Sequence, residues 1–129
     1  MKKNPGVWFE IYVDDMDRAR KFYETVFATT LTDMAMPEGL DNGMKMLSFP
    51  STMEPVGGAA GALVKMEGAK AGSGGTIIYF GTEDCAIEEA RVTSAGGKVF
   101  KPKMGIGEYG FITIAVDTEG NIFGIHSMK

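Results

Sequence analysis

VWFEIYV (residues 7–13) and the DDMDRARKFYETVF that follows it (residues 14–27) decide the fold of this chain. In the first stretch an apolar residue stands at every odd position, a period of two that is typical of a strand with one face on a core. Asp14 and Asp15 then offer capping oxygens to a helix. The apolar residues of this helix recur every three or four positions, which predicts one buried stripe: Ala19, Phe22, Tyr23, Val26 and Phe27.

The same pattern begins again sixty-nine positions later, in TIIYFGTED (residues 76–84). Here Ile78 is expected on the core face, and Asp84 caps a second helix that spans 85–95 and ends at a pair of glycines. Three extended segments follow each helix, at about 29–36, 44–49 and 61–66, and at 98–101, 111–116 and 122–127. The order strand-helix-strand-strand-strand therefore occurs twice. It predicts an α+β fold of two βαβββ modules, over about 6–66 and 76–128, with a glycine-rich linker over 67–75.

Length and composition limit the classes of protein to which the chain can belong. Its 129 residues fit a single domain. With 13 basic and 17 acidic residues the net charge is −4, and no basic cluster of the kind that binds nucleic acid is present. We expect neither a secretory signal nor a membrane-spanning segment, because no apolar stretch follows the basic start and no apolar run is long enough to cross a bilayer. Cys85 is the only cysteine, so no internal disulfide forms. We expect a cytoplasmic protein with no nucleic-acid or membrane partner.

Strand parity predicts a binding surface. One helix covers only one face of a four-stranded sheet, so two modules can turn their uncovered faces toward a shared trough. In strand 111–116 the odd positions are assigned to this trough and the even positions to the core. The predicted lining is mostly apolar with a few polar groups, as small-molecule sites require: Trp8, Glu10, Tyr12, Ile77, Tyr79, Phe111, Gly124 and His126.

Three segments resemble the vicinal oxygen chelate superfamily, which includes glyoxalase I, bleomycin resistance proteins, fosfomycin-resistance transferases and extradiol dioxygenases. They are FEIYVDDMDRARKFYETVF (9–27), GGKVF (96–100) and VDTEGNIFGIHS (116–127). The resemblance covers residues 6–127 and implies that the two modules form a mixed-sheet saddle or cup. Relatives commonly dimerise, and the open sheet edges expected here favour a homodimer as well.

The resemblance also bears on metal binding, because metal-dependent relatives carry a His or Glu ligand on each of four strands. Three of these positions correspond to Trp8, Ile77 and Gly124, and the fourth lies within 58–66, which holds no His, Asp or Glu. A divalent site needs three or more nitrogen or oxygen ligands. No cofactor is therefore predicted, and a divalent metal is disfavoured.

Glu10 and His126 lie two residues from vacant ligand positions, each on the same strand face. They form an acid–base pair or two ligands of a displaced metal site, or else Glu10 anchors a hydrogen bond at the rim and His126 simply titrates near the C-terminus. The literal G-x-G-x-x-G at 105–110 precedes a strand instead of a helix, so we expect a loop there and no dinucleotide site.

The leading hypothesis is a small-molecule binding protein, similar to the bleomycin-resistance branch, that needs no metal and does not turn its ligand over. Four aromatic residues would supply stacking and apolar contact: Trp8, Tyr12, Tyr79 and Phe111. Glu10 and His126 would supply polar recognition. The alternative is a lyase or isomerase of the glyoxalase type, in which Glu10 removes a proton α to a carbonyl while a displaced metal or His126 polarises the oxygen.

Overall fold

The computed structural model describes residues 4–35, 43–52, 54 and 57–129. It divides the chain into two compact units. The first module is Trp8–Thr76, and the second is Ile77–Lys129 together with the segment before Trp8. The end of the extended segment expected at 29–36 and most of the turn that follows it lie outside the described residues.

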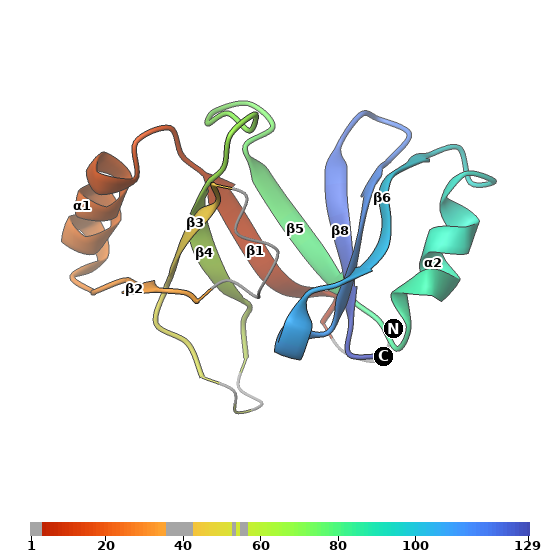
Figure 1. Ribbon diagram of the computed structural model, residues 1–129, viewed down its shortest axis with the longest axis horizontal. Helices are drawn as coiled ribbons and strands as arrows, with labels where there is room; N and C mark the ends of the chain where they lie inside the picture. The colour runs from red at the N-terminus through yellow and green to blue at the C-terminus, as the bar shows by residue number, and fades with distance from the viewer. Residues whose placement is uncertain (1–3, 36–42, 53, 55–56) are drawn as a thin grey trace. The chain divides into compact units, whose positions relative to one another are not determined.

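The first module consists of four strands and one helix (Figure 1): β1 (Gly6–Tyr12), α1 (Met16–Phe27), β2 (Thr32–Asp33), β3 (Lys45–Ser48) and β4 (Ala60–Lys65). β1 runs parallel to β4, β4 antiparallel to β3, and β3 antiparallel to β2. The strand order is therefore β2-β3-β4-β1.

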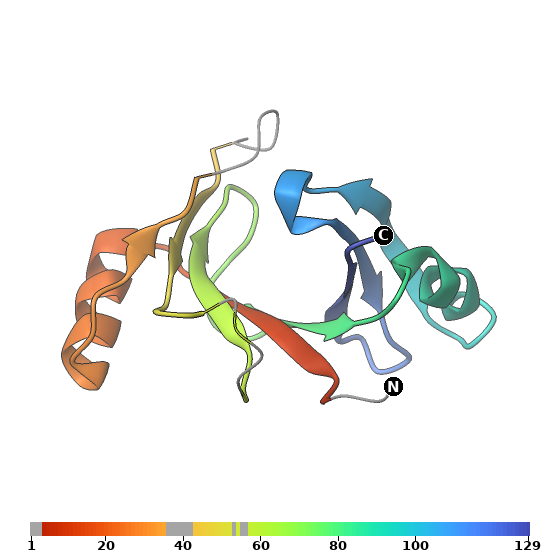
Figure 2. The same cartoon turned by 90° about the horizontal axis from the view of Figure 1, so that it is seen from below.

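The second module repeats this arrangement with β5 (Thr76–Gly81), α2 (Cys85–Val92), β6 (Lys98–Gly105), the short 3-10 turn η1 (Gly107–Tyr109), β7 (Phe111–Val116) and β8 (Ile122–Ser127). β5 runs parallel to β8, and β8, β7 and β6 follow in antiparallel pairs. The α+β class and the two βαβββ modules are thereby confirmed. In each module the helix lies against one face of its own strands (Figure 2). We call the other face the open face.

The apolar core of the first module lies between α1 and the odd face of β1. Asp15 caps α1 by accepting a hydrogen bond from the Arg18 amide at 3.0 Å, and Ala28 ends it in the left-handed conformation. The core cluster contains Val13, Met16, Leu31, Leu47 and Leu63, with Ile11, Ala19, Tyr23 and Phe49 packed against it. The parity predicted for β1 is therefore correct.

The stripe predicted for α1 is only partly buried. Ala19 and Tyr23 pack on the core, whereas Phe22, Val26 and Phe27 are 59%, 55% and 64% exposed. A straight helix touches a sheet along a narrow line, and the residues that flank this line remain outside even when their spacing is amphipathic.

The second helix is shorter than predicted. Asp84 caps it as expected, accepting from the Ala86 amide at 3.0 Å, but the helix ends at Val92. Gly96, with a φ of +99°, then reverses the chain in a conformation that favours glycine. α2 packs mainly on β6, β7 and β8. Ile78 of β5 lies on the predicted face, two residues from Phe80, which pairs with the buried Ile125, but Ile78 itself is 44% exposed.

The faces predicted for β7 are inverted. Thr113 is fully buried, and its hydroxyl donates to Glu89 of α2 at 2.8 Å, which places the odd residues on the helix-covered face. Phe111 lies on this face too, with Lys103 Nζ 4.7 Å from its ring centre. Ile112 and Ile114 pair with His126 and Gly124 and so belong to the open face. The alternation in FITIAV gives no clear core face, because both faces are apolar except for Thr113. Thr113 was assigned to the open face because it is polar, but its hydrogen-bond partner, Glu89, lies on α2.

Candidate functional site

A buried carboxylate lies on the open face of the first module. Glu10 is 8% exposed and accepts two hydrogen bonds from its own strand. The Trp8 indole Nε1–H donates to Oε2 at 3.1 Å, and the Tyr12 hydroxyl donates to Oε1 at 2.8 Å. Residues two apart on a strand share a face, which is why this sequence brings the three side chains together.

Burial and charge keep the Tyr12 phenol protonated. Burial raises the pKa of Tyr12 well above its ordinary value, and the neighbouring Glu10 charge and hydrogen bond raise it further. The phenol therefore remains a donor across the physiological range. Because each carboxylate oxygen has its own donor, the orientations of both aromatic rings are tied to Glu10.

Methionines surround this group. Met46, Ala62 and Val64 form a second buried cluster, and partly buried side chains pack against it: Trp8, Tyr12, Met34, Met44 and Met66. We call these eight residues the open-face cluster. Thioether side chains are flexible and polarisable, and they suit surfaces that adapt to a ligand. Ala62 is the β4 partner of Glu10 and is fully buried.

Strand parity also identifies the methionines that a search for polar groups overlooks. The eight residues predicted to line the trough include no methionine. Met66 has the same parity as Val64 at the end of β4, and the Met34 amide donates to the Met46 carbonyl at 3.1 Å. Extending the alternation along these strands would have found both.

Two of the predicted residues adjoin on the open face of the second module. Tyr79 is 5% exposed and pairs with Gly124 across β5 and β8. A Cβ built on Gly124 would lie 2.2 Å from the Tyr79 ring, so a residue with a side chain at this position would clash with the ring. Ile77, on the same face of β5, is 9% exposed.

His126 is engaged by the loop before β7. Its Nε2 lies 2.5 Å from the carbonyl oxygen of Tyr109 in η1. A carbonyl only accepts, so Nε2 carries the proton and Nδ1 is the nitrogen that remains for other partners. The G-x-G-x-x-G segment is thus a loop fastened to the last strand. His126 and Glu10 belong to different modules, and their pairing as acid and base stays a prediction.

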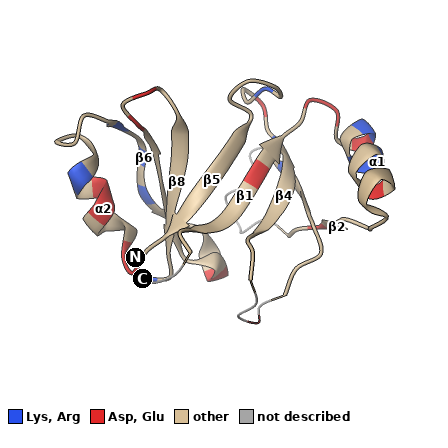
Figure 3. Cartoon of the chain, turned by 180° about the vertical axis from the view of Figure 1, so that it is seen from behind, with Lys and Arg blue, Asp and Glu red and all other residues tan. Residues whose placement is uncertain are grey.

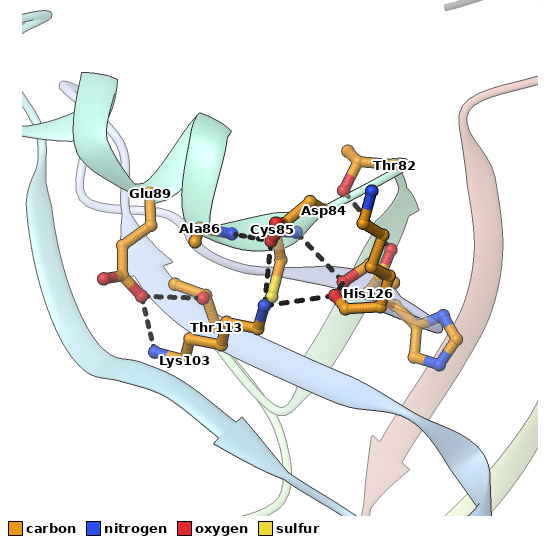
Figure 4. Close-up of polar contacts among 10 residues, drawn as sticks. Thr82, Asp84, Cys85, Ala86, Glu89, Lys103, Thr113 and His126 are labelled. Atoms are coloured by element: carbon orange, nitrogen blue, oxygen red, sulfur yellow. Dashed lines mark hydrogen bonds and ion pairs between the residues drawn. The ribbon is translucent and has the colours of Figure 1, made fainter.

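Phe111 does not join these residues. Its ring lies on the face that α2 covers, above Lys103, and its predicted place on the trough face is corrected accordingly. That face holds a polar network that strand patterns did not reveal (Figure 4). Lys103 Nζ donates to Asp84 Oδ1 at 2.8 Å, and the Cys85 amide donates to the Ser127 hydroxyl at 2.9 Å.

Hydrogen bonds in this network also stabilise the charged forms of Asp84 and Lys103. Glu89 Oε1 accepts from the Lys103 amide at 2.5 Å as well as from Thr113. The Lys103 ammonium, followed by the Ala86 amide, lowers the pKa of Asp84, and the hydrogen bond to Asp84 raises the pKa of Lys103. These residues join α2 to its sheet, which is a structural task.

The donor set does not fit the metal of the superfamily's metal-dependent members. Trp8, Ile77 and Gly124 offer no metal-binding atom in their side chains. Within the described ranges, no group of three or more His, Cys, Asp or Glu side chains is placed to hold an ion. Glu10 is the one charged residue of β1, and Figure 3 shows the rest of that strand uncharged.

Comparison with known proteins agrees with this fold. Residues 6–39 match the family described as bleomycin resistance protein-like N-terminal. No curated protein matches the sequence. Among solved structures, a Streptomyces coelicolor methylmalonyl-CoA epimerase in complex with 2-nitronate-propionyl-CoA has a TM-score of 0.67 at 17% identity, covering 96% of this chain and 94% of that one.

Two further structures are similar. The methylmalonyl-CoA epimerase of Mycobacterium tuberculosis has a TM-score of 0.63 at 13% identity, covering 97% of this chain and 88% of its own. A hypothetical protein of Bacillus halodurans has a TM-score of 0.67 at 14% identity, covering 99% and 96%. The chain therefore shares the fold of these structures, and its residues 6–39 match the bleomycin resistance protein-like N-terminal family, in agreement with the resemblance found in the sequence.

Neither of the two α-helices of the described chain is long and apolar enough to cross a bilayer.

Proposed function

We propose that this protein binds a small cytoplasmic molecule on its open-face cluster and that binding requires no metal ion. The preferred ligand has a planar or apolar part and carries a positive charge. Its apolar part contacts Trp8, Tyr12 and the methionines, and its charge is attracted by Glu10.

One observation carries the proposal. A carboxylate that is 8% exposed lies between an indole and a phenol on a sheet face that no helix of its module covers. Aromatic rings attract cations through the negative charge of their π faces, and a carboxylate beside them strengthens that attraction. The methionines supply apolar contact that adjusts to the shape of the ligand.

The test uses Trp8, the only tryptophan, as a fluorescent reporter. Metal-free bleomycin, a cation with planar rings, is titrated into the protein in the presence of EDTA, with propionyl-CoA as an anionic probe. We expect saturable quenching by bleomycin and weaker quenching by propionyl-CoA. Stronger quenching by propionyl-CoA overturns the charge preference, and no saturable quenching by either probe overturns the proposal.

Two variants separate recognition from folding. Glu10→Gln keeps the size of the side chain but removes its charge and one of its two acceptor oxygens, and should weaken bleomycin binding about tenfold to a hundredfold. Tyr23→Phe removes the same hydroxyl as Tyr12→Phe, but from the helix-covered face. It should leave the affinity unchanged, whereas Tyr12→Phe lowers it.

The alternative, an enzyme of the glyoxalase type, makes a different prediction for Glu10. In such an enzyme Glu10 is the base that removes the proton, and Trp8 and Tyr12 hold its two oxygens in position. Exchange of the α-hydrogen of propionyl-CoA with deuterium, abolished in Glu10→Gln, would favour the enzyme over the binding protein.

A further inference from the structure

Four methionines occupy neighbouring positions on the open face of the first module. Met46 of β3 is 8% exposed, and the other three pack, partly buried, against the cluster to which it belongs: Met34, Met44 and Met66. Under α1, by contrast, the core cluster consists mainly of leucine and includes Met16. Thioether sulfurs are therefore concentrated on the side of this sheet that its helix leaves open.

The strand register brings three of these side chains together. Lys45 pairs with Lys65 across β3 and β4. Met44 comes one residue before this pair and Met66 one residue after it, so the two methionines stand opposite one another. Met46 is two residues from Met44 and projects from the same face. Opposite side chains begin about 5 Å apart at Cβ and diagonal ones about 7 Å apart, so the three flexible methionine side chains can bring their sulfurs to one point.

Met34 adds a fourth thioether beside Met46. Asp33 pairs with Leu47 across β2 and β3, which places Met34 opposite Met46. The Met34 amide donates to the Met46 carbonyl at 3.1 Å, so the backbone pairing continues to this residue. The four side chains thus come from three hydrogen-bonded strands or their ends, and the sheet fixes their relative positions.

The charges of these strands favour a cation on the open face. Lys45 and Lys65 hold odd positions in β3 and β4, so their exposed side chains project from the other face. There Lys65 Nζ donates to the Asp14 carbonyl at 2.7 Å. The charged residue of β1, Glu10, lies on the open face. A negative charge on the same face, with the ammonium groups on the other, lowers the free energy of a cation bound among the methionines.

We propose that these four methionines, which we call the methionine site, bind a soft monovalent metal ion, Cu(I) or Ag(I). Thioether sulfur is a soft ligand that suits Cu(I), whereas Zn²⁺ is held by thiolate, imidazole and carboxylate groups. The ion is bound without a change in its oxidation state. The proposal does not rest on the proposed function, because the site requires no organic ligand and the divalent ions excluded there are of a different class.

The test is a titration of the full chain with silver nitrate in chloride-free buffer, with carbon-13 at the methionine methyls. A Cys85→Ser background removes the thiol, which is also a soft ligand. We expect the methyl signals of the methionine site to shift saturably at one ion per chain, while those of Met16 and Met128 stay in place. Zn²⁺ should move none of these signals. No saturable shift at the methionine site with Ag(I), or the same shifts with Zn²⁺, overturns the proposal.

Two paired variants separate metal binding from packing. Met44→Leu with Met66→Leu removes two sulfurs at similar side-chain volume and should weaken Ag(I) binding about tenfold or more. Met16→Leu with Met128→Leu removes as many thioethers, one buried and one exposed, from outside the site, and should leave the affinity unchanged. The same ranking is expected for Cu(I), measured anaerobically by competition with the Cu(I) chelator bicinchoninate. Circular dichroism confirms that each variant is folded. Equal affinities of the first variant and the parent protein contradict the site.

Discussion

The two modules share one topology but place their polar groups on opposite faces. In the first, the helix-covered face is an apolar cluster around Leu47 and Leu63, and the carboxylate Glu10 lies on the open face. In the second, a polar network lies under the helix, and Tyr79 occupies the place that corresponds to Glu10. The two modules therefore have the same strand pairing but different side chains at equivalent positions.

Equivalent pairs show this in detail. Glu10 pairs with Ala62 in the first module, and Tyr79 pairs with Gly124 in the second. Leu47 of β3 and Thr113 of β7 hold corresponding positions, opposite Leu63 and Ile125, and are 1% and 0% exposed. A leucine and a hydrogen-bonded threonine thus fill the same place under the two helices.

The largest effect is expected in the apolar module. Leu47→Ala removes a side chain that is 1% exposed and leaves a cavity. It should lower the free energy of unfolding by about 3 kcal/mol. Urea denaturation followed by circular dichroism measures the change. A loss below about 1 kcal/mol would mean that this cluster is not the core we describe.

A smaller loss is expected in the polar module. Glu89→Ala leaves the buried Thr113 hydroxyl and the Lys103 amide without their acceptor. The free energy of unfolding should fall by about 2 kcal/mol. Adding Thr113→Val to Glu89→Ala should restore about 1 kcal/mol, because the orphaned hydroxyl is removed as well. Strict additivity of the two substitutions contradicts the bond between them.

The smallest effect is expected on the stability of the protein at acidic pH. The pKa of Asp84 is lowered mainly by Lys103, and that of Glu24 by the Leu31 amide and then by Arg20. A carboxylate with a lowered folded pKa stabilises the protein fully above its unfolded pKa, near 4, and this contribution is lost as the pH falls through the folded value.

Asp84→Asn and Glu24→Gln should therefore each reduce the loss of stability below about pH 4. Urea midpoints at a series of pH values measure it, with Asp33→Asn as the control for removing one charge. If both variants follow the wild-type curve, the two ion pairs contribute nothing to acid sensitivity.

Sequence patterns predicted the fold because the first module begins with an unambiguous strand and the second module repeats its strand-helix order. In β1 the odd residues are all apolar and the even ones mixed, so the core face is determined within one strand. The polar triad follows from the same alternation, since Trp8, Glu10 and Tyr12 are two residues apart.

The errors have a common physical cause, which is that a strand or helix pattern does not record its partner. Phe111 was placed on the wrong face because the acceptor that allows Thr113 to be buried, Glu89, comes from α2. Phe22 and Val26 were expected in the core because their spacing is amphipathic, but contact with the sheet is taken by neighbouring residues. The engagement of His126 by Tyr109 depends on a loop conformation that no periodicity encodes.

The most direct test of the open-face site is an NMR titration, because the indole N–H of Trp8 gives a single resolvable signal. Metal-free bleomycin is added in the presence of EDTA to protein labelled with nitrogen-15 and with carbon-13 at the methionine methyls. We predict saturable shifts of the Trp8 indole and of Met34, Met44 and Met46, with the Thr113 amide unmoved. Shifts confined to the helix-covered faces, or shifts that need an added divalent metal, would contradict the account.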